Sequence, residues 1–186
     1  MRSGIRHLLI LASVFLLSCA TARNPDEYLD EETAALVRSA SAPIIFARAH
    51  PDVAANARQY ANVVAASVNR AGDYEFLLIV YFWSTVDPRL GTGAHPGDIL
   101  VLLADERAVR LQRDGRTLKE AGIARPLLRP VHFRGQPRIY RTDRNTLRFI
   151  STARHLRLQL EGDQDARPFD VWKDGRRELG RVAAND

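Results

Sequence analysis

This sequence of 186 residues has few of the residues that hold small folds together covalently or through metals. It contains one cysteine, one methionine and two lysines. A single cysteine excludes an internal disulfide framework and a cysteine-rich zinc site. No low-complexity tract, fixed-period repeat or interior linker rich in Gly, Pro or Ser divides the chain. One folded domain is therefore the simplest interpretation.

Catalytic signatures are also missing. The sequence has no Gly-x-Ser-x-Gly, no His-Glu-x-x-His, no phosphate loop and no Cys-x-x-Cys. Residues 91–97 loosely resemble a dinucleotide fingerprint, but the third glycine comes one place late and Pro96 would disturb the helix start. We therefore expect no cofactor, no metal and no enzymatic activity.

The composition is that of an ordinary globular domain, with 46% apolar and 26% charged residues. This balance excludes collagen-like, coiled-coil, largely disordered and multi-span membrane proteins.

The N-terminus carries the strongest signal in the chain. Arg2, Arg6 and His7 form a short basic region, and residues 8–17 follow as an apolar run. Ten helical residues rise about 15 Å, half of the roughly 30 Å hydrocarbon core of a bilayer. A basic start followed by a short apolar run is typical of a secretory signal peptide.

The signal ends in Leu16, Leu17, Ser18 and Cys19. This ending resembles the lipobox of bacterial lipoproteins. The resemblance implies that the sulfur of Cys19 receives a diacylglycerol, that signal peptidase II cleaves between Ser18 and Cys19, and that the new amine is acylated. In the alternative interpretation the signal is an ordinary secretory one and Cys19 is incidental.

The same resemblance predicts the location and the domain boundaries. Ala20 is not the aspartate that retains lipoproteins in the inner membrane, which implies an anchor in the outer membrane, facing the periplasm. Residues 1–18 would be the signal peptide, 19–27 the acylated cysteine and a short tether, and 28–186 one globular periplasmic domain. Residues 20–27 reach at most about 29 Å, so the domain would lie close to the membrane.

Charge is distributed unevenly along the chain that would follow cleavage. This mature chain has 25 basic and 22 acidic residues, a net charge of +3. Residues 19–104 carry −4 and residues 105–186 carry +7. The cationic half could face anionic lipids, lipopolysaccharide phosphates or an acidic partner, or its arginines could simply cover solvated strands. Nucleic acid is not expected as a partner of an exported protein.

Hydrophobic patterning predicts a mainly β fold. Residues 74–84 are apolar on both faces of one strand, so a second sheet, a helix or another subunit must cover each face. Further strands are expected at 59–69, 98–103, 108–112, 138–141, 155–161 and 167–172, with an edge strand at 33–48 broken at Ala42-Pro43, a helical turn at 51–57, and short helices capped by Thr142 and Asp174. The predicted architecture is an antiparallel β-sandwich, or a curved antiparallel sheet with one or two short covering helices.

The first candidate site is the loop after residue 84. Asp87, Arg89, His95 and Asp98 lie within twelve residues beside the end of the core strand. A histidine and two carboxylates can bind a ligand or a metal, or transfer protons, if the fold brings them together. Asp and Pro also favour turns, so a plain connecting loop is the alternative.

The second candidate site is a series of arginines alternating with aromatic residues. Arg134, Arg138, Arg141 and Arg148, with Arg144 between them, can clamp phosphates or carboxylates bidentately. The alternative is the polar face of a hairpin in which residues 131–133 pair with 138–141.

These observations favour a lipid-anchored envelope protein that acts without catalysis, in envelope assembly or maintenance. Its partner would be another envelope protein, peptidoglycan or lipopolysaccharide. A small-ligand or glycan binder using the 85–98 loop is the alternative. A hydrolase whose residues meet only in space is a third hypothesis.

Overall fold

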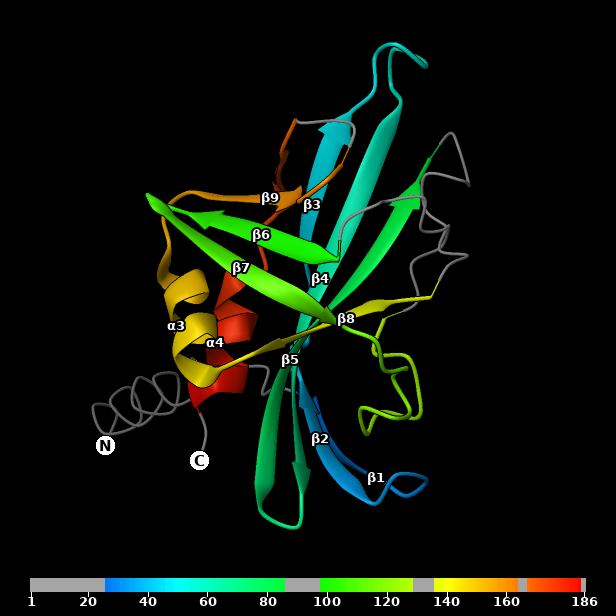
Figure 1. The fold of residues 1–186 in the computed structure, drawn as a ribbon, viewed down its shortest axis with the longest axis vertical. Coiled ribbons are helices and arrows are strands. Elements are labelled where there is room, and N and C mark those ends of the chain that lie inside the picture. Colours follow the sequence, from blue (N-terminus) through cyan, green and yellow to red (C-terminus); the bar gives the residue numbers. More distant parts are fainter. Residues whose placement is uncertain (1–25, 86–97, 129–135, 164–166, 185–186) are drawn as a thin grey trace, which may run out of the picture.

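A computed structural model describes residues 26–85, 98–128, 136–163 and 167–184 (Figure 1). The elements in chain order are β1 (Asp26–Asp30), β2 (Ala35–Ser39), β3 (Ile44–Ala49), β4 (Arg58–Arg70), β5 (Asp73–Ser84), β6 (Ile99–Ala104), β7 (Arg107–Asp114), β8 (Arg138–Thr142), α3 (Arg144–Thr152), β9 (Leu156–Leu160), β10 (Phe169–Lys173) and α4 (Arg176–Ala184). Neither of these two helices is long and apolar enough to cross a membrane.

Eight of the strands close into an antiparallel barrel. The order around the ring is β4, β3, β10, β9, β6, β7, β8 and β5, and β5 pairs again with β4. β1 and β2 extend the sheet beyond the ring, because β2 pairs with the second half of β4. The prediction of a mainly β, antiparallel fold with two short helices is confirmed. A closed barrel is more specific than the predicted sandwich or curved sheet.

The longest pairing joins β4 and β5 in twelve residue pairs, from Gln59 opposite Ser84 to Arg70 opposite Asp73. Ala71 and Gly72 connect the strands, with φ of 53° and 100°. Two positive φ angles in a two-residue loop match the right-handed twist of the flanking strands. The strands predicted at 59–69 and 74–84 are confirmed, and each is slightly longer than expected.

Both faces of β5 are buried, as its sequence predicts. Leu78, Val80 and Phe82 face the barrel interior, and the opposite face carries Leu77, Ile79 and Tyr81. Residues 117–128, which follow β7 without forming a strand or an α-helix, cover the second face together with β1 and β2. Burial raises the pKa of Tyr81 to about 12. Irregular chain therefore provides one of the covers for which a sheet, a helix or another subunit was expected.

The helices pack against each other, and α4 also contacts β4 (Figure 1). Their buried side chains include Leu147, Ile150, Leu179 and Val182, all of which belong to the main core. Asp143 caps α3 by accepting a hydrogen bond from the Thr146 N–H at 2.9 Å. The cap predicted at Thr142 is therefore wrong by one residue, because Thr142 is the last residue of β8.

Other local predictions need correction near the N-terminus. The break at Ala42-Pro43 is confirmed, but neither resulting strand is an edge, since β2 lies between β1 and β4 and β3 lies between β4 and β10. Residues 51–57 form turns and no α-helix, and one turn there has helix-like bonds, in which the N–H groups of Val53 and Ala54 donate to the carbonyl oxygen of His50. β1 begins at Asp26, within the segment interpreted as a tether. The hairpin predicted between 131–133 and 138–141 is not tested, because residues 131–133 lie outside the described ranges. Within those ranges, β8 (Arg138–Thr142) pairs with β5 and β7.

Close packing at Gly175 leads to a stability prediction. A Cβ atom built on Gly175 would collide with the carbonyl group of Pro43, which is backbone and cannot rotate away. Gly175→Ala is expected to lower the free energy of unfolding by about 2 kcal/mol, the usual cost of overpacking. Urea unfolding measures the change. Gly115→Ala is the matched control, because an added Cβ there meets nothing within 4 Å; equal stability losses in the two variants would contradict this packing.

Candidate functional site

Two hollows adjoin each other on the outer surface of the barrel, beside β10. Asp170 and Val171 line both of them. The ladder that joins β10 to β9 is short, with Phe169 opposite Leu158 and Asp170 opposite Arg157. We call the hollow lined by Arg154, Arg157 and Arg176 the arginine hollow, and the hollow lined by Trp172 the tryptophan hollow.

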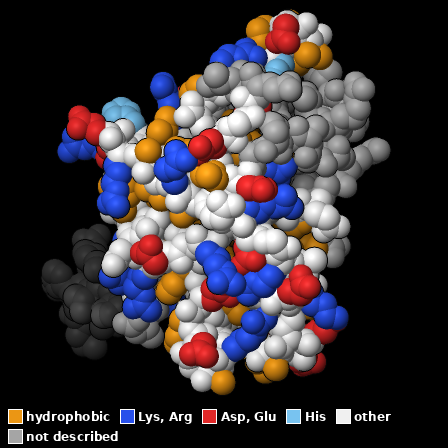
Figure 2. Space-filling view, in the orientation of Figure 1, with side chains coloured by type: hydrophobic (Ala, Val, Ile, Leu, Met, Phe, Trp, Pro, Cys, Tyr) orange, Lys and Arg blue, Asp and Glu red, His pale blue; other side chains and the backbone are white. Residues whose placement is uncertain are grey.

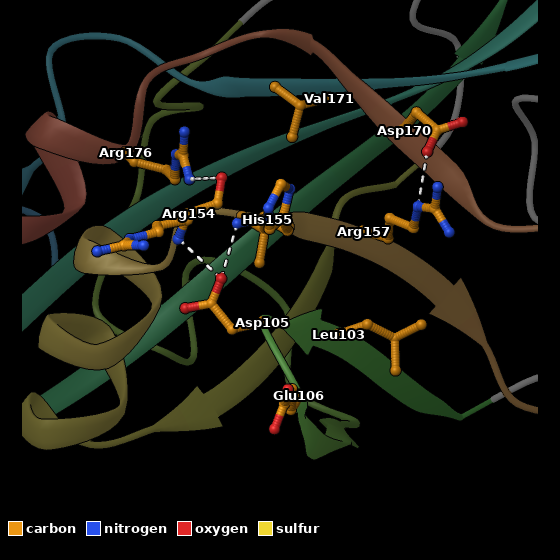
Figure 3. A pocket seen from close by; sticks show the side chains of 10 residues that line it. Leu103, Asp105, Glu106, Arg154, His155, Arg157, Asp170, Val171 and Arg176 are labelled. Carbon is orange, nitrogen blue, oxygen red and sulfur yellow. Dashed lines mark hydrogen bonds and ion pairs between the residues drawn. The ribbon is translucent and has the colours of Figure 1, made fainter.

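The arginine hollow has a volume of about 730 Å³ and lies over β6, β9 and β10, next to the start of α4 (Figure 3). Its polar lining comes from Asp105, Glu106, Arg154, His155, Arg157, Asp170 and Arg176. Four of these side chains are basic and three are acidic, so the lining is nearly balanced in charge.

Asp105 fixes the backbone immediately before β9. Its carboxylate accepts hydrogen bonds from the backbone N–H groups of Arg154 and His155 at 2.9 and 2.8 Å (Figure 3). These bonds, that from His155 foremost, lower the pKa of Asp105 below its usual range. Asp105 is therefore ionised at neutral pH, where it organises the backbone and has no proton to donate.

Three further charges of the arginine hollow, those of Arg157, Asp170 and Arg176, also have protein partners. Arg176 donates to the carbonyl oxygen of Ala153 and pairs with Asp174 at 2.6 Å. Arg157 pairs with Asp170 at 2.9 Å. None of the described lining residues is Ser, Thr or Cys. The described lining thus offers charged groups but no hydroxyl or thiol nucleophile for covalent catalysis.

The tryptophan hollow has a volume of about 490 Å³ and lies between β3 and β10. Its lining includes Arg48, Arg58, Arg167, Asp170 and Trp172. The β10–β3 ladder shifts register between Val171 and Lys173, which places Trp172 at a β-bulge. Bulges redirect side chains, and the Trp172 side chain is 59% exposed.

Trp172 is the outermost of three aromatic rings from three strands. Tyr60 on β4 stacks on Trp83 of β5, with ring centroids 4.2 Å apart and planes 12° from parallel. Trp172 meets the Tyr60 ring edge-on at 6.4 Å. The indole N–H of Trp83 donates to Asn62 at 3.0 Å. The inner rings are thus fixed by stacking and by a hydrogen bond, and they support the outer one.

Arg48 brings a charge into the barrel next to this hollow. The residue is 5% exposed. Its guanidinium donates to Asp163 at 2.9 Å and to Gln59 at 2.7 Å, and it lies 4.3 Å from the centre of the Phe169 ring. A buried charge is tolerated when it is paired and hydrogen-bonded, as this one is.

No family model, curated protein or solved structure matches this chain. Across the described ranges, no group of three or more His, Cys, Asp or Glu side chains is placed to hold a metal ion. Function must therefore be inferred from the chain's own surfaces.

The loop predicted as a site is only partly described. Asp87, Arg89 and His95 lie outside the described residues. Asp98 comes directly before β6, and its carboxylate is 3.6 Å from the guanidinium of Arg113. A site formed by the four residues stays a prediction.

The predicted anion-binding arginines occupy different environments. Arg138 is buried in the barrel, 5.6 Å from the centre of the Phe82 ring. Arg141 is exposed and pairs with Asp114 at 2.9 Å and Glu75 at 3.1 Å. Arg148 is exposed on α3, and Arg134 lies outside the described residues. The three described arginines therefore do not form one patch. On the face shown in Figure 2, basic and acidic side chains are interspersed.

The sequence did not predict either of the two hollows. Both tryptophans were assigned correctly to strands, but Tyr60, Trp83 and Trp172 come together only through the order and register of β10, β3, β4 and β5. No spacing along the chain encodes that arrangement.

The pairing of Arg141 with Asp114 leads to a pH prediction. Asp114 accepts hydrogen bonds from Arg116 foremost and from Arg141, which hold its pKa well below the usual range. A lowered pKa in the folded state stabilises the protein above the ordinary pKa of about 4, and this stability is lost as pH falls. Asp114→Asn should cost about 2 kcal/mol of unfolding free energy at pH 7, somewhat less at pH 3 and much less at pH 2, because the stabilisation disappears only as pH falls towards the lowered pKa; urea unfolding at pH 7 and pH 2 measures the difference.

The exposed Asp52 provides the matched control for this prediction. Asp52→Asn should leave stability unchanged at both pH values. A loss at Asp114 that is as large at pH 2 as at pH 7 would show that charge is not its cause.

Proposed function

We propose that this chain is a lipid-anchored protein of the cell envelope, and that its folded domain is a non-catalytic interaction module. The observation that carries the proposal is the sequence of residues 16–19, which ends the apolar run with Leu-Leu-Ser-Cys. Acyl chains on Cys19 would hold the protein at the periplasmic face of the outer membrane. Two or more acyl chains give stable anchoring, whereas one is marginal.

The position of β1 supports a domain held close to the bilayer. β1 begins at Asp26, seven residues after Cys19. Seven residues span at most about 25 Å. The folded domain would therefore begin within about 25 Å of the membrane.

Three structural features favour binding over catalysis. Large side chains from the strands and both helices fill a continuous core. The arginine hollow has no hydroxyl or thiol among its described lining residues. Asp105 and Asp170, its best-placed carboxylates, are held by backbone N–H groups and by Arg157, respectively. The partner would be an envelope protein, peptidoglycan or lipopolysaccharide.

Binding of a small ligand or glycan is the second candidate function. The specific observation in its favour is Trp172, a largely exposed indole beside a hollow that contains charged side chains. Ligand sites commonly combine an aromatic surface with a few placed polar groups.

Replacement of Cys19 tests the anchor. The wild-type protein should have the mass of a chain that starts at Cys19 and carries acyl chains, and it should fractionate with the outer membrane. Cys19→Ala should remain unacylated and be lost from that fraction, because the sulfur that receives the diacylglycerol is gone. Intact-mass spectrometry and membrane fractionation provide the readouts.

Ser18→Ala is the matched control, since it keeps a small residue before the cysteine. It should be processed like the wild type. An unmodified wild-type mass, or equal release of wild type and Cys19→Ala into the soluble fraction, would overturn the anchor.

A further inference from the structure

The tryptophan hollow combines features that a purely structural role does not require. Trp172 is 59% exposed, although exposed surface is unfavourable for a large aromatic ring. Arg58 places its guanidinium 4.8 Å from the centre of the indole. The ring is therefore held over the edge of the hollow instead of being packed into the core.

The supports of Trp172 are preorganised. The ring planes of Tyr60 and Trp172 lie 80° apart, and Tyr60 is itself stacked on Trp83, which is hydrogen-bonded to Asn62. A ring held in this way loses little conformational freedom when a ligand stacks on it. Such an arrangement favours a ligand that presents a flat, weakly polar face.

The charge of the hollow specifies the ligand further. Its described lining contains three arginines, Arg48, Arg58 and Arg167, and one carboxylate, that of Asp170. Arg48 pairs with Asp163, and Asp170 pairs with Arg157. Guanidinium groups bind carboxylates and phosphates through paired hydrogen bonds.

We propose that the tryptophan hollow binds an acidic saccharide. One face of the sugar ring, with its C–H groups, would stack on the part of the exposed Trp172 indole that Arg58 does not cover. Arg58, at the border of that surface, would bind the carboxylate or phosphate on the sugar ring, and a ring hydroxyl would donate to Asp170. A hollow of about 490 Å³ is large enough for one or two sugar rings.

This inference rests on the proposed function, because it names the ligand class of a binding module in the envelope. Its test is nevertheless separate. Saccharide binding is measured on the protein purified as the cell processes it, whether or not Cys19 is acylated. Failure to bind would leave the anchor experiment unaffected, and an unmodified Cys19 would leave the binding measurement unaffected.

The experiment compares two trisaccharides of the same length, one of galacturonic acid and one of galactose. Isothermal titration calorimetry and tryptophan fluorescence should detect binding of the acidic trisaccharide, at least about tenfold tighter than the neutral one. Added salt should weaken this preference, because it depends on charge.

Three variants locate the site. Trp172→Ala should weaken binding of the acidic trisaccharide by about tenfold or more, and Trp172→Phe should retain part of it. Arg58→Gln should reduce the preference for the acidic over the neutral sugar. Tyr74→Ala is the matched control, because Tyr74 is 55% exposed and lies next to the β4–β5 turn; it should bind like the wild type.

Thermal unfolding of each variant verifies that the fold is intact. Three results would overturn the proposal: no binding of either trisaccharide, equal binding of both, or binding that survives Trp172→Ala unchanged.

Discussion

The paired strands β4 and β5 are the element on which the rest of the structure depends. Twelve residue pairs hold them together, and most of their length is buried on both faces. A strand pair that is apolar on both sides is stable in water only when both sides are covered. The ring of shorter strands and the helices provide one cover, and residues 117–128 with β1 and β2 provide the other.

The length of β4 also explains how the sheet divides. Its first half pairs with β3, inside the ring, and its second half pairs with β2, outside it. The proposed binding surface adjoins the first half of β4. Tyr60 and Trp83 lie opposite each other near the end of the long pairing, where small Ala47 on β3 is the neighbour of Tyr60. The tryptophan hollow thus lies beside one end of the longest strand pairing among the described residues.

The sequence predicts the local elements well because their signals are local. The alternation in residues 155–161 and the doubly apolar pattern of β5 each correspond to one strand, and Asp174 accepts the N–H of Arg176 at the start of α4, as expected of a cap. Closure of the ring could not be predicted. β10 pairs on one side with β9, the preceding strand, and on the other with β3, which comes much earlier in the chain. The pairing of β10 with β3 depends on packing between distant segments, which no periodicity in the sequence records.

The candidate site shows the same division. Reasoning along the chain groups residues that are neighbours in sequence, such as Arg138, Arg141 and Arg148, and the fold separates them. The aromatic rings beside the tryptophan hollow are far apart in sequence and meet in space. A strand places successive side chains on opposite faces, so Arg138 and Arg141, three residues apart on β8, point to opposite sides of the barrel wall.

The late position of β10 in the chain has a consequence for folding. Until Phe169–Lys173 is paired, β3 and β9 have no partner on the sides that β10 later occupies. A partly folded chain without these pairings presents two open strand edges, and such edges template pairing with other chains. Since pairings between distant segments form slowly, the docking of β10 against β3 decides how long these edges stay open to self-association.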